Sequence, residues 1–193
     1  MNRDATEPRD EPGEHLIRSI SADEWPQVKR LRLLALQDPV APLAFLETYD
    51  DALAKPDSFW QERAERGARD SGTGQQIIAQ GTDGAWVGSV TVLIEEAGTV
   101  DWAGYPVERR QGHLVGVWVR PDHRGIGMTE RMFARAVEWA WHIGVDRVRL
   151  MVHEDNERAQ GLYRKCGFAP TGRVVSLEMT PGESELEFVL DRA

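Results

Sequence analysis

The chain has 193 residues, of which 41% are hydrophobic and 28% are charged, and its formal net charge is −9. This length supports one domain with a sizeable core, and the composition is that of an ordinary globular protein. The acidic balance argues against a nucleic-acid partner, because such proteins need a basic face. No apolar run reaches the length of a membrane helix and no secretory signal stands out, so we expect a cytoplasmic protein that binds no membrane.

Cys166 is the single cysteine of the chain, which excludes an intrachain disulfide and suits a reducing compartment. We expect it to be a small buried residue. The histidines show no paired spacing of the kind that metal ligands need, so we expect no metal. They stand at His15, His113, His123, His142 and His153.

The first half of the chain alternates polar segments with apolar periodicity. Residues 1–14 are almost entirely polar and are expected to form a disordered leader before a single domain at 15–193. Ser21 is placed to cap a helix, and the spacing of Ser58 and Gln61 predicts a capping box for another. Two prolines, Pro39 and Pro42, end the first helix and precede a short or irregular segment. The predicted elements are a strand at 15–20, helices at 25–35 and 59–68, and strands at 75–80 and 85–94.

The second half begins with a polar link at 95–111, whose length is typical of functional or mobile loops. The apolar strand that follows, at 112–119, is expected to lie centrally in the sheet. An apolar helical stripe from Met132 to Trp141 predicts a helix that Gly144 ends. The remaining predicted elements are a strand at 147–152, a helix at 157–165 and strands at 168–179 and 185–190. This order predicts an α+β fold with helices on both faces of a sheet.

The stretch from Val115 to Thr129 reads as a strand that stops at Pro121, a glycine-containing turn and the start of a helix. Such a turn leaves backbone N–H groups unpaired in front of the positive end of the helix dipole, which predicts an anion site of the phosphate-binding kind. The stretch lacks the third glycine of a dinucleotide-binding fingerprint and the Gly-Lys-Ser/Thr of a P-loop. Hydride transfer and nucleotide hydrolysis are therefore disfavoured.

A second motif follows in the order Asn156-x-x-Ala159-x-x-x-Tyr163-x-x-x-Gly167-Phe168. Together with Arg124-x-x-Gly127 and the preceding strand, it resembles the GNAT family of acyl-CoA-dependent N-acetyltransferases. The resemblance extends over residues 15–193 in the order of elements and is most specific over 114–172. It implies a mixed, mostly antiparallel central sheet of about seven strands with helices on both faces.

The resemblance also implies a binding site for acetyl-CoA as the acyl donor. The family's diphosphate-binding pattern falls on Arg124, Gly125, Ile126, Gly127, Met128 and Thr129, with Thr129 in place of a smaller residue. By resemblance, the backbone N–H groups of these six residues hold the diphosphate of coenzyme A. The resemblance also implies that the pantetheine arm pairs with Val117, Trp118 and Val119 and is positioned by Asn156. Tyr163 would give its phenolic proton to the coenzyme A sulfur. Without the resemblance, Tyr163 reads as a packing residue.

The general base is harder to assign. An amine must be neutral to attack a thioester, and His113 stands where the family often places an acid, with a side-chain type whose ordinary pKa is about 6.5. Glu95, Glu96 and Asp101 are the other candidates, and a lone histidine is more often structural. We do not expect Cys166 and His153 to form a nucleophilic pair, because the family transfers the acyl group directly.

The resemblance implies an N-acetyltransferase that acts on a primary amine of a small molecule or a peptide, as a monomer or homodimer. The alternative is a coenzyme A-binding sensor or subunit of the same fold without catalysis, and use of a longer acyl-CoA is a less favoured reading. In this family, residues 25–68 and 95–111 would form the acceptor pocket. Their aromatic and acidic side chains suit a cationic amine, although other acceptors fit equally well.

Overall fold

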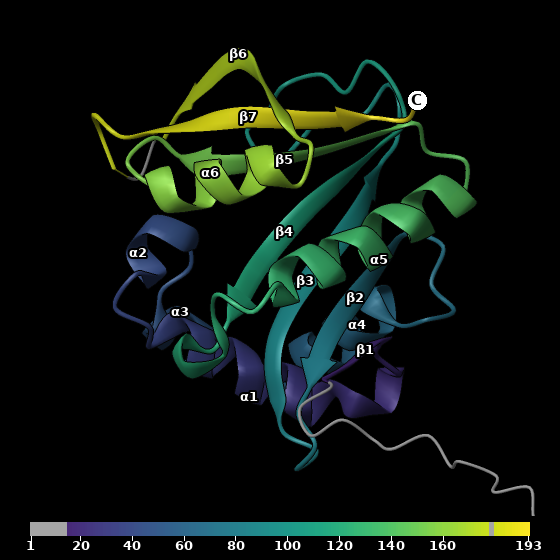
Figure 1. Ribbon diagram of the computed structural model, residues 1–193, viewed down its shortest axis with the longest axis vertical. Coiled ribbons are helices and arrows are strands. Elements are labelled where there is room, and N and C mark those ends of the chain that lie inside the picture. Colours follow the sequence, from purple (N-terminus) through teal and green to yellow (C-terminus); the bar gives the residue numbers. More distant parts are fainter. Residues whose placement is uncertain (1–14, 178–179) are drawn as a thin grey trace, which may run out of the picture.

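A computed structural model describes residues 15–177 and 180–193 of the chain. The described residues form a seven-stranded sheet in the order β1-β2-β3-β4-β5-β7-β6, in which only β4 and β5 pair in parallel (Figure 1). The predicted α+β fold with a mostly antiparallel sheet is confirmed. The strands are β1 Leu16–Ser19, β2 Gly74–Gln80, β3 Trp86–Glu95, β4 Gln111–Val119, β5 Arg147–His153, β6 Ala169–Ser176 and β7 Ser184–Asp191.

Helices cover both faces of this sheet, as predicted. Helices α5 and α6 pack on one face, and α1, α3 and α4 pack on the other (Figure 1). Short 3₁₀ turns at Ala22–Glu24 and Pro121–His123 precede α1 and α5. The helices are α1 Trp25–Leu36, α2 Ala41–Ala44, α3 Tyr49–Leu53, α4 Asp57–Gly67, α5 Met128–His142 and α6 Glu157–Lys165.

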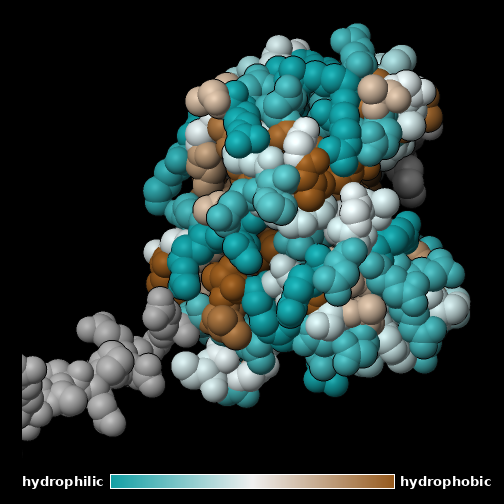
Figure 2. Space-filling view, turned by 90° about the vertical axis from the view of Figure 1, so that its right-hand side faces the viewer, coloured by the Kyte–Doolittle hydropathy of each residue, from teal (hydrophilic) through white to brown (hydrophobic). Residues whose placement is uncertain are grey.

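Two hydrophobic clusters hold the layers together. On the α5 face, Met132, Phe133 and Ala136 of the predicted apolar stripe are buried against β2 to β5. On the opposite face, Val28 of α1 and Trp60 of α4 are fully or almost fully buried. The surface shown in Figure 2 is mainly hydrophilic, with small hydrophobic patches between the polar residues. The chain therefore buries apolar surface on both sides of the sheet, which is the main source of its stability.

Near the helix starts, the structure differs in part from what the local sequence signals predict. Ser58 lies inside α4, whose N-cap is Pro56 with no side-chain cap, so the predicted capping box is wrong there. A box-like contact forms instead at Ser21, whose backbone N–H donates to the Glu24 carboxylate at 2.8 Å. The short or irregular segment predicted after Pro39 and Pro42 consists of two short helices, α2 and α3. The expected leader at 1–14 and the last two residues of the strand predicted at 168–179 lie outside the described residues.

The polar face of β5 carries a buried cationic side chain. Arg149 is 1% exposed and contacts three carboxylates. Its guanidinium donates to Glu95 at 2.8 and 2.7 Å, to Asp101 at 3.1 Å and to Glu187 at 3.2 Å. These contacts join β3, β5, β7 and the 95–111 link, so the predicted polar link is anchored to the sheet at Asp101.

Replacing Arg149 by methionine should destabilise the fold by about 3–5 kcal/mol, because three buried carboxylates lose their shared cation. The matched control is Arg147→Met on the same strand, whose ion pair with Asp191 is 2.7 Å long but half-exposed and worth less than about 1 kcal/mol. Urea denaturation at neutral pH measures both effects. Equal losses in the two variants would contradict a structural role for the buried cluster.

Candidate active site

The sheet opens between its two parallel strands. Pairing of β4 with β5 stops after Leu114 and Leu150, although β4 continues to Val119 and β5 to His153. The other edge of β4 stays paired with β3 from Gln111 to Val119, apart from a bulge at 116–117. One edge of β4, from residue 115 to 119, therefore faces an opening and not a neighbouring strand.

A β-bulge lies in the part of β4 that borders this opening. Ser89 pairs with Trp118 and Thr91 with Val115, so three steps along β4 match two steps along β3. The extra residue requires a left-handed backbone conformation at Gly116, whose φ is +64°. Glycine adopts this conformation at no steric cost. A bulge leaves backbone groups outside the ladder and bends the strand. Backbone donors thus become available at the centre of the sheet.

The predicted diphosphate loop lies at one end of the opening. Gly125 and Gly127 have φ values of +81° and +77°, and Gly127 is the N-cap of α5 without a side-chain cap. Within the described residues, the N–H groups of 125–129 make no backbone hydrogen bond, whereas the N–H of Arg124 donates to Pro121. A Cβ at either glycine would meet no atom within 4 Å. The loop therefore leaves five N–H groups without a backbone partner at the positive end of a helix, with free space beside its two glycines.

The side chain of Arg124 turns away from this loop toward the α1–α2 connection. Its Nη2 pairs with the Asp38 carboxylate, and its Nε donates to Val119 O at 2.8 Å. Trp118 Nε1 donates to the same carboxylate at 2.9 Å. Burial alone would raise the pKa of Asp38, but the hydrogen bonds from Val40 N–H, Trp118 and Arg124 lower it overall. Asp38 thus fastens the strand and the loop to α1, a role that the sequence did not reveal.

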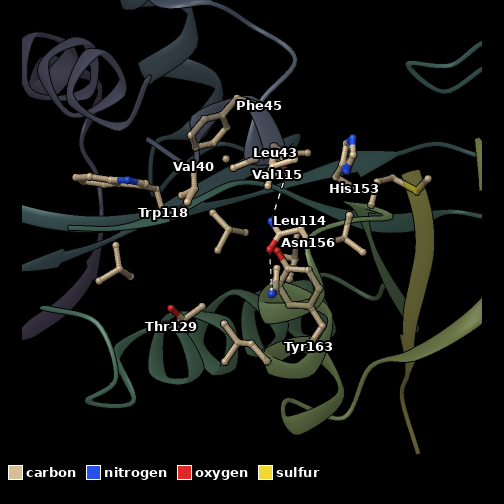
Figure 3. A pocket seen from close by; sticks show the side chains of 18 of the residues that line it. Val40, Leu43, Phe45, Leu114, Val115, Trp118, Thr129, His153, Asn156 and Tyr163 are labelled. Carbon is tan, nitrogen blue, oxygen red and sulfur yellow. Dashed lines mark hydrogen bonds between the residues drawn. The ribbon is translucent and has the colours of Figure 1, made fainter. Parts of the chain in front are cut away.

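A cavity of about 620 Å³ occupies the opening. Figure 3 shows that it is lined from both sides of the sheet: Val40, Leu43 and Phe45 lie on one side of the strands, and Thr129 and Tyr163 lie on the other. All residues predicted to bind the acyl donor line it except Ile126 and Gly127, which stand in the loop at its edge. The cavity is therefore a passage between the diphosphate loop and the α1 face.

Tyr163 projects from α6 into this passage. Its ring stacks on Phe133 at a centroid distance of 5.7 Å and contacts Phe188 edge-on at 6.4 Å. Burial, followed by the nearby Cys166 and Glu185, raises the pKa of the phenol. The hydroxyl makes no hydrogen bond within the part of the chain that the structure describes. The phenol thus stays protonated, and its proton is available to a group in the cavity.

Asn156 lies at the start of α6 and faces the same cavity. Its Oδ1 accepts a hydrogen bond from Ala159 N–H at 3.1 Å, and its Nδ2 donates to Leu43 O at 3.4 Å (Figure 3). It therefore caps α6 and connects that helix to α2. This arrangement fixes the position from which α6 presents Tyr163.

His113 and Glu95 form a buried pair at the other end of the cavity. His113 lines the cavity, and its Nδ1 lies 3.0 Å from Glu95 Oε1. Because an ionised carboxylate only accepts hydrogen bonds, Nδ1 carries the proton and the lone pair of a neutral imidazole lies on Nε2. Burial would raise the pKa of Glu95, but hydrogen bonds from His113 and Arg149 lower it to about 2. Glu95 is therefore suited to orient His113, and Glu96 pairs with Arg110 in solvent.

Glu185 and His153 are titratable residues that line the cavity and were not predicted as site residues. Glu185 faces His153 in the β5–β7 register, and burial raises the pKa of its carboxyl group. His153 Nδ1 accepts from Asp155 N–H at 3.1 Å, and Nε2 lies 3.3 Å from Glu183. Charged residues on the inner face of two predicted strands were the available signal. Cys166 is partly buried, less than expected, and burial raises the pKa of its thiol.

The described residues contain no cluster of three or more histidine, cysteine or acidic side chains that could hold a metal ion. None of their helices is long and apolar enough to cross a membrane.

Comparison with known proteins identifies the family to which the chain belongs. Residues 25–168 match the family model described as the Acetyltransferase (GNAT) family. The chain therefore belongs to the GNAT acetyltransferases, an enzyme family, as its motifs predicted.

Named relatives agree with this assignment. A Bacillus subtilis (strain 168) protein named “Putative ribosomal protein bS18-alanine N-acetyltransferase” is 34% identical over 86 residues, and the match covers 37% of this chain and 57% of that protein. A GNAT-family acetyltransferase of Streptococcus pneumoniae superimposes with a TM-score of 0.73 at 17% identity, over 93% of this chain and 100% of the other. The Salmonella typhimurium protein yncA, solved with its cofactor acetyl-CoA, gives 0.65 at 15% identity, with coverages of 93% and 95%. At these identities the structures show the fold alone.

Acid titration should show how much the Glu95 contacts contribute to the stability of the fold. A carboxyl whose folded pKa is depressed stabilises the fold above its unfolded value of 4.5, and this contribution is lost as the pH falls toward about 2. Glu95→Gln should therefore lower the free energy of unfolding at pH 7, and the difference from the wild type should shrink between pH 5 and pH 2. Urea denaturation across this range measures it.

Glu96→Gln provides the control for that titration, because its carboxylate is solvent-exposed. A difference between wild type and Glu95→Gln that stays constant with pH would refute the pairing.

Proposed function

We propose that this protein transfers the acetyl group of acetyl-CoA directly to a primary amine of a small molecule or a peptide. One observation carries the proposal: a single cavity joins the free edge of β4, the diphosphate loop and the phenol of Tyr163. A protein that only sensed coenzyme A would have no need for a protonated phenol and a carboxylate-oriented histidine that line the same cavity.

The residues present fit an acyl-CoA. The five N–H groups of residues 125–129 suit a diphosphate, and Gly125 and Gly127 leave room for its close approach. The free edge of Val117, Trp118 and Val119 suits the amides of pantetheine, which can pair with it as an added strand. When bound, the thioester supplies an activated carbonyl carbon and a thiolate leaving group.

At the acceptor side, His113 Nε2 takes a proton from the acceptor's ammonium group, which frees the nitrogen lone pair for attack. Glu95 holds the imidazolium that results, as a carboxylate does in catalytic triads. Backbone N–H groups of the bulge at Gly116 and Val117 are suited to stabilise the charge that develops on the carbonyl oxygen.

At the donor side, Tyr163 gives its proton to sulfur as the carbon–sulfur bond breaks, and solvent restores the phenol. His113 passes its first proton to water, then takes the remaining extra proton of the new amide nitrogen and releases that proton to water as well. The products are the acetylated amine, free thiol and one proton released to water.

Amine-dependent thiol release from acetyl-CoA tests the proposal, and Tyr163→Phe tests the acid. Because the variant keeps the ring packing and loses only the hydroxyl, kcat should fall by about 100-fold or more while the Kd for coenzyme A stays within about twofold. A thiol-release assay measures kcat, and calorimetry measures the Kd for coenzyme A. Unchanged kcat would remove the acid role, and coenzyme A binding without amine-dependent thiol release would favour a sensor or subunit.

The pH profile tests His113. In His113→Gln the amide keeps a hydrogen bond to Glu95 but has no titratable lone pair, so kcat/KM should fall and the limb that reports deprotonation of the base should disappear or move to higher pH. Glu185→Gln is the comparison, since Glu185 is a cavity-lining carboxyl whose pKa is raised by burial. If this limb of the pH profile disappeared in Glu185→Gln and remained in His113→Gln, the general base would be Glu185 and not His113.

A further inference from the structure

The α1 face of the cavity carries two arginines, Arg32 of α1 and Arg63 of α4. Glu47 is the carboxylate that balances them there. This end of the cavity thus has an excess of one positive charge, although the chain as a whole is strongly acidic.

The Arg32 side chain is held in place, but only some of its hydrogen-bond donors have partners. Its Nε donates to Glu47 Oε2 at 2.9 Å, and its guanidinium lies over the Phe45 ring at 4.2 Å. Its side chain is 13% exposed. Its two terminal nitrogens have no hydrogen-bond partner among residues 15–177 and 180–193. The guanidinium is therefore oriented by one contact and retains donors for another.

Arg63 has neither a hydrogen bond nor an ion pair within the described residues, although it is only partly exposed. Burial, together with the like charge of Arg32, lowers the pKa of Arg63 to about 10, so it remains charged at neutral pH. A partly buried cation without a partner is costly, and this cost is recovered when an anion binds.

The two arginines lie beside the reacting centre. A small second cavity is lined by Arg32 and Arg63 together with Ser89, Thr91 and Gly116, the bulge residue. Phe45, under Arg32, lies across the strands from Tyr163 in Figure 3. The pair therefore borders the acceptor side of the bulge, on the opposite face of the sheet from the helix that starts at the diphosphate loop.

We propose that Arg32 and Arg63 form a carboxylate-binding subsite, and that the acceptor is an amine carrying a carboxylate a few bonds from its nitrogen. This inference rests on the proposed acetyl transfer. Planar guanidinium groups bind carboxylates through paired N–H donors, and two of them can grip both oxygens.

Matched acceptors test the subsite. Glycine, alanine and leucine should be acetylated with a kcat/KM about 10-fold or more above that of their amides, with most of the difference in KM. Tripeptide amides that begin with Asp or Asn show whether a side-chain carboxylate serves as well. In Arg63→Gln, KM for the carboxylates should rise by about 10-fold while values for the amides stay unchanged. Arg66→Gln, on the exposed side of the same helix, should behave as wild type.

Calorimetry gives a readout that does not depend on turnover. N-acetylglycine should bind the coenzyme A-loaded protein more tightly than N-acetylglycinamide, and Arg63→Gln should abolish the difference. Acetylation of amines without a carboxylate preference would overturn the subsite and leave acetyl transfer standing. If no amine is acetylated, acetyl transfer fails, and calorimetry alone then decides the subsite: equal binding of the two probes overturns it.

Discussion

The parting of β4 from β5 after Leu114 and Leu150 is the constraint on which the rest of the site depends. Had the parallel pairing continued, the edge of β4 would be used by the sheet and no passage would connect its two faces. The bulge at Gly116 increases the separation by bending β4 at the same level. One irregularity in hydrogen bonding therefore creates a backbone edge, a set of unused donors and a cavity.

Charged contacts hold this opening in shape. Asp38 connects Trp118 of β4 and Arg124 of the turn to α1, so the strand and the diphosphate loop keep a fixed relation. At the far end, Arg149 gathers carboxylates from β3, β7 and the 95–111 link, and Glu95 extends that cluster to His113. Burial makes these networks costly to break and gives the cavity rigid walls.

The sequence predicted the sheet and the strand–turn–helix segment at 115–129 well because their signals are local. Apolar periodicity defined the strands and α5, and the proline and glycines at 121–127 defined the turn between β4 and α5. It did not predict Asp38, because an acidic residue after a helix looks like any solvated turn residue until Trp118 and Arg124, 80 and 86 positions further along the chain, contact it. The partnership of Arg32 with Arg63 was missed for the same reason, since their shared cavity exists only after α1 and α4 pack together.

A crystal structure with acetyl-CoA tests the central claim, that the opening between β4 and β5 is the acyl-donor site. The account predicts diphosphate oxygens within hydrogen-bonding distance of the N–H groups of residues 125–129, pantetheine amides paired with the edge of β4 between 115 and 119, and sulfur within reach of the Tyr163 hydroxyl. A coenzyme A bound elsewhere, or one whose pantetheine does not follow β4, would contradict it.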